Sequence, residues 1–116
     1  MFIVGEAWGA EEELHEKPFI GPPGYLLRNA LAHNGVNMDY CYLTNVFNFR
    51  PYNNDIEKLC GVKEYAIPGY RAYKRGKFVI KKYEPEIERL WQEIKKQQPN
   101  CILALGATAM LSLIHI

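Results

Sequence analysis

The feature that most constrains the fold is the alternation of short strand-like runs with segments of helical pattern. Runs of apolar or strand-forming residues lie at 2–5, 40–46 and 101–105. Between them, residues 24–33 and 85–97 space their apolar side chains at helical intervals. Strands that alternate with helices are typical of a parallel sheet. We therefore predict an α/β fold, a three-layer α/β/α sandwich with a mostly parallel central sheet.

Residues 85–97 carry the clearest helical signals. Pro85 suits the first turn of a helix, where its missing N–H does no harm. Acidic residues near the start, with Lys95 and Lys96 near the end, match the helix dipole. The apolar stripe of this helix is interpreted as core and not as a cofactor site; its members are Ile87, Leu90, Trp91 and Ile94.

Residues 47–83 are interrupted by proline, asparagine and glycine, so we expect mostly loops, with a helical turn near 56–59 and a strand at 77–80. The segment 70–83 contains six basic residues and no acidic one, although the whole chain has a formal net charge of only +1. Its cations could meet DNA phosphates and its interleaved aromatic side chains could stack on bases. The alternative is a solvated hairpin whose aromatic side chains pack inward, and the sequence alone leaves both open.

Length and composition fit one domain over residues 1–116 that buries a core without disulfides. No apolar run approaches the roughly 20 residues of a membrane helix. The N-terminus lacks a signal-peptide pattern, so we expect a cytoplasmic protein without membrane association. Cys41, Cys60 and Cys101 are scattered and show no CxxC spacing. We therefore expect no metal site or disulfide framework, and interpret the cysteines as small apolar residues in or near the core.

Glycine or polar residues stand where each predicted strand ends. The sequence GEAWG at residues 5–9 follows the first strand, Asn45 ends the second and Gly106 follows the third. Glycines in such a loop allow a backbone to approach a ligand closely. Because ligands of parallel sheets bind beyond the carboxyl ends of the strands, we expect these three loops to form one crevice.

Four motifs in this chain resemble the uracil-DNA glycosylase superfamily, and most closely its family 4-like branch and the related phage-type proteins. The motifs are GEAWG at 5–9, PFIGPPGYLL at 18–27, LTNVFNFRP at 43–51 and ILALGATA at 102–109. They occur in the family's order and approximate spacing over nearly the whole chain. The resemblance implies an α/β/α sandwich that hydrolyses the N-glycosidic bond between uracil and deoxyribose, on a base turned out of the DNA stack.

The resemblance also implies roles for individual residues. Glu6 matches the motif carboxylate that positions or activates the attacking water. Phe19 matches the aromatic that stacks on the flipped base, and Asn45 matches the asparagine that reads the N3–H and O4 edge of uracil. Backbone amides around Gly5, Glu6 and Ala7 would bind pyrimidine oxygens. The expected DNA contacts are Gly9, Gly24, Lys74, Arg75, Lys77, Lys81 and Lys82.

Each of the three side chains also has a purely structural alternative. Glu6 could be a buried carboxylate that caps a turn. Phe19 could be an ordinary core aromatic, and Asn45 could be a turn-forming asparagine at the end of a strand.

The chain departs from the family pattern in two respects. Iron–sulfur members carry a cysteine pair before the first strand and a cysteine before the Arg-Pro of the third motif, where Phe49 stands here, so we expect no cofactor. The family's His-Pro loop, which donates to the uracil O2, lies beyond the ALG strand and its helix, and His115 comes too early and lacks the proline. We therefore expect LSLIHI to be a truncation point, with a fold incomplete at its C-terminus and weak activity.

The leading hypothesis is a monomeric uracil-DNA glycosylase-type repair enzyme whose partner is uracil-containing DNA. A catalytically silent nucleic-acid-binding module of the same fold is the alternative. A third possibility is an unrelated α/β enzyme that binds a nucleotide or phosphate at GEAWG. It is disfavoured because neither GxGxxG nor GxxxxGK[ST] is present.

Overall fold

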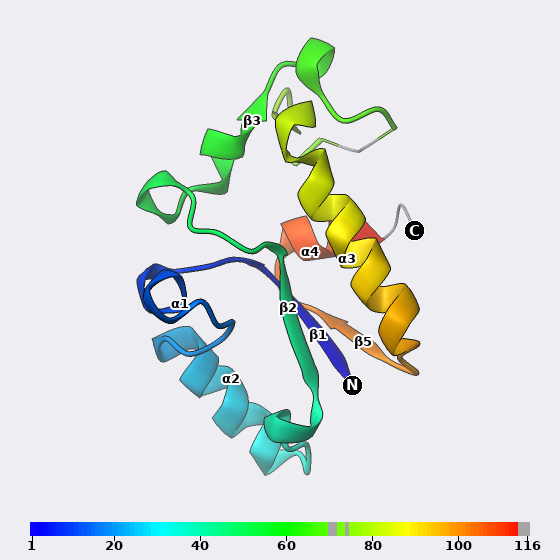
Figure 1. The fold of residues 1–116 in the computed structure, drawn as a ribbon. Helices are drawn as coiled ribbons and strands as arrows, with labels where there is room; N and C mark the ends of the chain where they lie inside the picture. The colour runs from blue at the N-terminus through cyan, green and yellow to red at the C-terminus, as the bar shows by residue number, and fades with distance from the viewer. Residues whose placement is uncertain (70–71, 74, 114–116) are drawn as a thin grey trace.

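A three-stranded parallel sheet in the order β2-β1-β5 forms the centre of the protein (Figure 1). The computed structural model describes residues 1–69, 72–73 and 75–113. The strands of the sheet are β1 (Phe2–Ala7), β2 (Tyr42–Phe47) and β5 (Ile102–Ala104). In the middle strand, Phe2 pairs with Tyr42 on one side and with Ile102 on the other, and both pairings are parallel. The α/β fold with a mostly parallel central sheet is therefore confirmed.

Helices lie on both sides of this sheet (Figure 1). They are α1 (Ala10–His15), α2 (Pro22–His33), α3 (Glu84–Gln97) and α4 (Ala107–Leu113). On one face, Phe2 and Val4 pack in a buried cluster with Leu90 of α3 and Ala109 of α4. Figure 1 shows α2 on the opposite side of the sheet, and Ile3, which alternates with Phe2 and Val4 along the strand, is fully buried there.

The two longer helices follow the sequence pattern. Two prolines open α2 at Pro22, two residues before the predicted start, and Pro85 lies in the first turn of α3. The predicted apolar stripe of α3 does face the core, with Ile87 and Leu90 buried and the other two members packed partly buried against the same cluster.

Three details differ from the prediction. β1 continues through Ala7 because its ladder with β2 extends to a pairing of Ala7 with Phe47, so Gly5 to Ala7 form strand and not loop. The short helix α1 was not expected. β5 has a partner on one side only, and Ile102 and Cys101 are exposed. The expectation that Cys101 lies in or near the core is therefore wrong, whereas the other two cysteines are half-buried.

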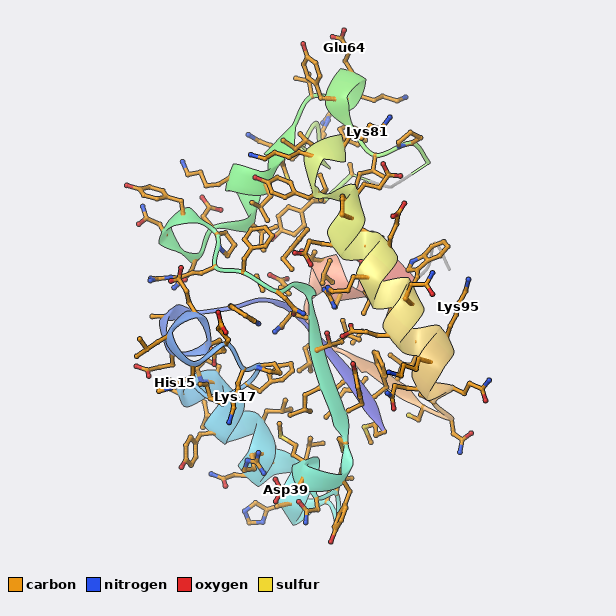
Figure 2. All side chains as sticks on the ribbon, in the orientation of Figure 1. His15, Lys17, Asp39, Glu64, Lys81 and Lys95 are labelled. Atoms are coloured by element: carbon orange, nitrogen blue, oxygen red, sulfur yellow. The ribbon has the colours of Figure 1, made fainter. Side chains whose placement is uncertain are left out.

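Residues 50–83, between β2 and α3, form what we call the insertion lobe. A small antiparallel pair, β3 (Cys60–Gly61) and β4 (Phe78–Val79), lies within it, and a 3₁₀ turn at Ile56–Leu59 precedes β3. The turn and the strand agree with the prediction for this region. Buried side chains of the lobe join the main core; they are Ile56, Leu59, Ile67 and Val79. Figure 2 shows Lys81 on this lobe, far from Lys17 beside α1.

None of the helices in the described part of the chain has the length and apolarity that crossing a bilayer requires.

Candidate functional site

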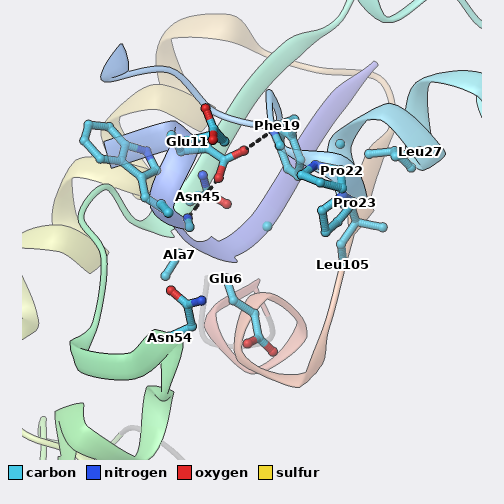
Figure 3. A pocket seen from close by; sticks show the side chains of 17 residues that line it. Glu6, Ala7, Glu11, Phe19, Pro22, Pro23, Leu27, Asn45, Asn54 and Leu105 are labelled. Carbon is cyan, nitrogen blue, oxygen red and sulfur yellow. Dashed lines mark hydrogen bonds between the residues drawn. The ribbon is translucent and has the colours of Figure 1, made fainter. Parts of the chain in front are cut away.

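A cavity of 580 Å³ lies at the carboxyl end of the sheet (Figure 3). Loop and strand segments from three distant parts of the chain form its walls, as expected for a parallel sheet. Seven residues nominated from the sequence line it; they are Gly5, Glu6, Ala7, Gly9, Phe19, Gly24 and Asn45. The structure therefore brings the nominated side chains together around one space. Trp8, Glu11, Glu12, Asn54 and Leu105 also line it and were not nominated.

Gly5 lies against the two side chains expected to hold a base. It pairs with Asn45 across the β1–β2 ladder. A Cβ built on Gly5 would lie 2.3 Å from Oδ1 of Asn45 and 2.8 Å from Cζ of Phe19. The absence of a side chain at Gly5 thus lets the protein's own asparagine and phenylalanine approach each other. The prediction that this glycine makes room for a ligand is therefore only part of its role.

Asn45 is 2% exposed, and its Nδ2 has no hydrogen-bond partner among the described residues. A buried donor without a partner costs about 1–3 kcal/mol. A ligand that brings an acceptor to this amide would recover that cost. The structural alternative, a turn-forming asparagine, does not fit because Asn45 is a paired residue inside β2.

The backbone of Asn45 is fixed by Arg89 of α3, a residue that the sequence analysis did not single out. Its Nη2 donates to the carbonyl oxygens of Asn45 and Val46 at 2.7 and 2.9 Å. Nη1 donates to Oγ1 of Thr44 at 3.1 Å. One guanidinium therefore holds three consecutive residues of β2 and sets where the Asn45 side chain begins.

Two acidic side chains of α3 keep Arg89 in place. Nε of Arg89 donates to Glu86 at 2.9 Å, and Glu93 accepts from Nη1 of Arg89. Glu93 also accepts from the hydroxyls of Tyr42 at 3.0 Å and Thr44 at 2.8 Å. Burial raises the pKa of Tyr42, and its bond to Glu93 adds to that rise. In the sequence, the i, i+3 and i+4 spacing of these charges indicates a salt-bridged helix face. It does not indicate that the arginine also reaches the end of a strand.

Glu6 occupies the end of the cavity nearest α4 (Figure 3). Its Oε1 would lie 2.5 Å from a Cβ on Gly106, at the end of β5. In the described part of the chain its carboxylate has no hydrogen-bond or ion-pair partner. The turn-capping role considered for Glu6 belongs instead to Glu12, which accepts from three backbone amides. The Glu6 carboxylate is thus available to a water or ligand in the cavity.

Asn54, in the loop after β2, lies beside Ala7 and Glu6 in Figure 3. Nε of Arg50 donates to its Oδ1 at 2.7 Å. This bond fixes the orientation of the Asn54 amide near the Glu6 end of the cavity. The run of two asparagines after Pro51 indicates only a turn in the sequence, so this residue was missed.

The nominated cations do not line the cavity. Arg75, Lys77, Lys81 and Lys82 are exposed on the insertion lobe, and Lys74 lies outside the described residues. The neighbouring rings are not free to stack on bases, because Tyr73 and Tyr83 pack against the core and Phe78 is half-buried. For Tyr73, Phe78 and Tyr83, the structure therefore agrees with the alternative in which the aromatic side chains pack inward. The described cations lie on the outer surface of this segment.

The residues present do not fit the iron–sulfur cluster of related proteins. Phe49, at the position of one cluster cysteine, stacks on the ring of Tyr83 with centroids 5.6 Å apart. Burial, followed by the charge of Glu57, raises the pKa of the Cys60 thiol, which disfavours the thiolate that binds metal. No group of three or more His, Cys, Asp or Glu residues among those described is arranged to hold a metal ion.

Sequence comparison identifies the family. The family model described as "Uracil DNA glycosylase superfamily" matches residues 1–116, the whole chain. This chain belongs to the uracil-DNA glycosylase superfamily. The family resemblance predicted from the four motifs is therefore confirmed at the level of the superfamily.

Three curated relatives, each described as "Type-4 uracil-DNA glycosylase", illustrate the similarity. The protein of Thermotoga maritima is 32% identical over 108 residues, which cover 93% of this chain and 45% of the relative. Identity is 44% over 65 residues with that of Archaeoglobus fulgidus, covering 51% and 32% of the two chains. For Pyrobaculum aerophilum it is 46% over 54 residues, covering 47% and 28%. The chain thus spans less than half the length of these relatives. Their descriptions lend no support to a catalytically silent module.

Proposed function

We propose that this protein is a uracil-DNA glycosylase of the family 4-like branch, with phage-type relatives, and that it hydrolyses the N-glycosidic bond of uracil in DNA. The observation that carries the proposal is the cavity lined by the Asn45 amide, the Phe19 ring and the Glu6 carboxylate, where neither Nδ2 of Asn45 nor the carboxylate of Glu6 has a partner among the described residues. We propose further that it acts in the cytoplasm as a monomer.

Asn45 is proposed to select the base. Its amide offers one acceptor and two donors, which can pair with the N3–H and O4 of uracil. Cytosine presents the reversed pattern and would leave polar groups unpaired, at about 1–3 kcal/mol each. Phe19 is proposed to stack on the base without regard to its identity. Backbone amides around Gly5, Glu6 and Ala7 are proposed to complete the contacts to the pyrimidine oxygens.

Glu6 is proposed to act on the attacking water. A carboxylate without a protein partner can accept a proton from water and can stabilise positive charge on the sugar. The cavity must receive a base that has left the stack, so DNA has to lie across its mouth. Gly9 and Gly24 are proposed to lie against the DNA backbone. The exposed cations of the insertion lobe, Arg75, Lys77, Lys81 and Lys82, are proposed to meet phosphates further along the strand, together with Lys74, which lies outside the described residues.

The proposal is tested by measuring free uracil released from an oligonucleotide with one uracil, beside identical oligonucleotides with cytosine or thymine at that position. We expect release from the uracil oligonucleotide alone. Glu6→Gln should lower the rate by about 10²–10⁴ while leaving binding intact. Glu13→Gln, which removes an exposed charge outside the cavity, is the matched control. Absence of both uracil release and preferential binding of the uracil oligonucleotide would overturn the proposal.

A further inference from the structure

The carboxylate of Glu12 joins two walls of the cavity. We call residues 5–9 the GEAWG segment and residues 18–21 the PFIG loop. Oε1 of Glu12 accepts from the backbone N–H of Gly9 at 3.0 Å, which belongs to the GEAWG segment. Oε2 accepts from the N–H groups of Ile20 and Gly21 at 2.9 and 2.6 Å, which belong to the PFIG loop. Each wall is thus held by a different oxygen of one carboxylate (dashed lines in Figure 3).

The PFIG loop needs such support because the backbone of Phe19 is strained. Phe19 has a φ of 57°, in the left-handed region that a phenylalanine rarely adopts. A strained residue of this kind persists only where the surrounding structure fixes it. Gly24 makes room for it, since a Cβ there would lie 2.1 Å from the carbonyl oxygen of Phe19. Glu12 fixes it through the amides of the next two residues.

Other candidates for this role are absent from the same walls. Helix α1 buries none of its residues, and Glu12 is its only half-buried member. Its neighbour Glu13 is exposed and lies 3.8 Å from Arg50, which is a loose ion pair. Glu11 lines the cavity but makes no hydrogen bond to either wall in the described part of the chain.

We propose that Glu12 is a positioning residue that sets the opening between the GEAWG segment and Phe19, and thereby how tightly the cavity holds a flipped base. The second half of this statement rests on the proposed function, because it takes the base to be a flipped pyrimidine. Glu12 acts through Phe19 and Gly9 and touches no reacting atom.

The chemistry of the link requires a carboxylate. Both oxygens must accept, and neither can be replaced by a group that only donates. Glutamine keeps one acceptor, so Glu12→Gln can hold one wall but not both. Burial alone would raise the pKa of Glu12, but hydrogen bonds from the amides of Gly21, Gly9 and Ile20 outweigh it and lower the pKa below its ordinary value. The carboxylate therefore stays ionised over a wider range of pH than an exposed glutamate does.

The first test needs no ligand. In a ¹⁵N-resolved pH titration of the wild-type protein, we expect the amide signals of Gly9, Ile20 and Gly21 to shift together, with a midpoint below the ordinary pKa of a glutamate side chain. In Glu12→Gln, the amides of at least one wall should exchange with solvent about tenfold faster. Glu13→Gln, on the same helix and with the same change of charge, should leave all three amides unchanged. Three amides that titrate independently, or that are untouched by Glu12→Gln, would overturn the proposal.

The second test measures the opening itself. Free uracil is titrated into the wild-type protein, Glu12→Gln, Glu13→Gln and Gly24→Ala. The last variant disturbs Phe19 because its methyl group would lie against the Phe19 carbonyl oxygen. We expect both Glu12→Gln and Gly24→Ala to weaken uracil binding at least about tenfold, with Glu13→Gln at the wild-type value. In the oligonucleotide assay, Glu12→Gln should raise KM more than it lowers kcat, since it disturbs binding and not the chemical step.

The outcomes separate the two proposals. If the wild-type protein neither releases uracil nor prefers the uracil oligonucleotide, the proposed function fails, and the pH titration alone decides whether Glu12 joins the two walls. If the amides respond as expected but Glu12→Gln binds uracil within about twofold of wild type, Glu12 does not set the opening and the proposal fails. Thermal unfolding of each variant shows whether it is folded, and the wild-type titration remains decisive if Glu12→Gln is not.

Discussion

Replacing Gly5 with alanine should disable the cavity while leaving the sheet intact. An added Cβ would lie 2.3 Å from Oδ1 of Asn45 and 2.8 Å from Cζ of Phe19. Ordinary contacts of a methyl group with these atoms are roughly 3.4 Å or longer. The asparagine amide must therefore retreat by about 1 Å, and the ring by somewhat less. Gly5 itself has no strained backbone, so the effect arises from these two displaced side chains.

The size of the effect follows from what the displacement breaks. An amide moved by about 1 Å loses at least one hydrogen bond to the base, which costs about 1–3 kcal/mol when the group is buried. This corresponds to a loss of about 5- to 150-fold in uracil affinity. Overpacking should also lower the free energy of unfolding by about 1–3 kcal/mol.

The assay is a uracil titration combined with chemical denaturation, with Gly61→Ala as the matched control. A Cβ on Gly61 would lie 2.9 Å from Cγ2 of Ile80, in the insertion lobe and outside the cavity. This control should lose some stability but no uracil affinity. A folded Gly5→Ala protein that binds uracil within about twofold of wild type would refute the reasoning that Gly5 exists to let Asn45 and Phe19 meet.

Four further changes have defined expected results. Asn45→Asp should weaken discrimination of uracil from cytosine about tenfold or more in competition binding, with affinity for DNA without uracil nearly unchanged. Exchanging Lys81 and Lys82 for glutamine should lower affinity for any sequence and reduce the slope of log affinity against log salt by about one charge each. Arg89→Lys should lower the free energy of unfolding by about 1.5–3 kcal/mol in urea, because a lysine cannot bond the Asn45 and Val46 carbonyls together. The pKa of Glu12 is lowered in the folded state. Its carboxylate therefore contributes fully to stability above the ordinary carboxyl pKa, and this contribution is lost as the pH falls through the lowered value. In Glu12→Gln, the free energy of unfolding should consequently fall less between about pH 6 and about pH 3 than it does in the wild-type protein.

The sheet and its two longer helices could be predicted because their signals are local. Continuous apolar runs mark the strands, and the stripe that includes Ile87 and Leu90 marks α3. Helix α1 has no such stripe, since none of its residues is buried. Its first turn is capped by the hydrogen bond from the N–H of Gly9 to the carboxylate of Glu12. The exposure of β5 could not be predicted, because an apolar run does not tell whether a strand has one neighbour or two, and Ile102 is 37% exposed.

The lining of the cavity was predicted better than its supports. Gly5, Phe19 and Asn45 were found because each belongs to one of the four motifs. Glu12 and Arg89 were not found, because each acts by hydrogen bonds to backbone groups of other segments. In the sequence Glu12 is one of three consecutive glutamates, and nothing local distinguishes it from its neighbours. The hydrogen bond that distinguishes Glu12, from the N–H of Gly21, spans nine residues and exists only in the folded chain.

The two ends of the insertion lobe lie side by side where the lobe joins the sheet domain. Phe49, two residues after β2, stacks on Tyr83, directly before α3, and six residues further along Arg89 fastens α3 to the end of β2. The exposed loops and charges of the lobe can therefore vary while Asn45 keeps its place, provided that Ile56, Leu59, Ile67 and Val79 stay in the core and Asn54 stays at the cavity. A designer could reverse the charge of the outer surface of the lobe and so tune the proposed attraction to DNA independently of which base the cavity accepts.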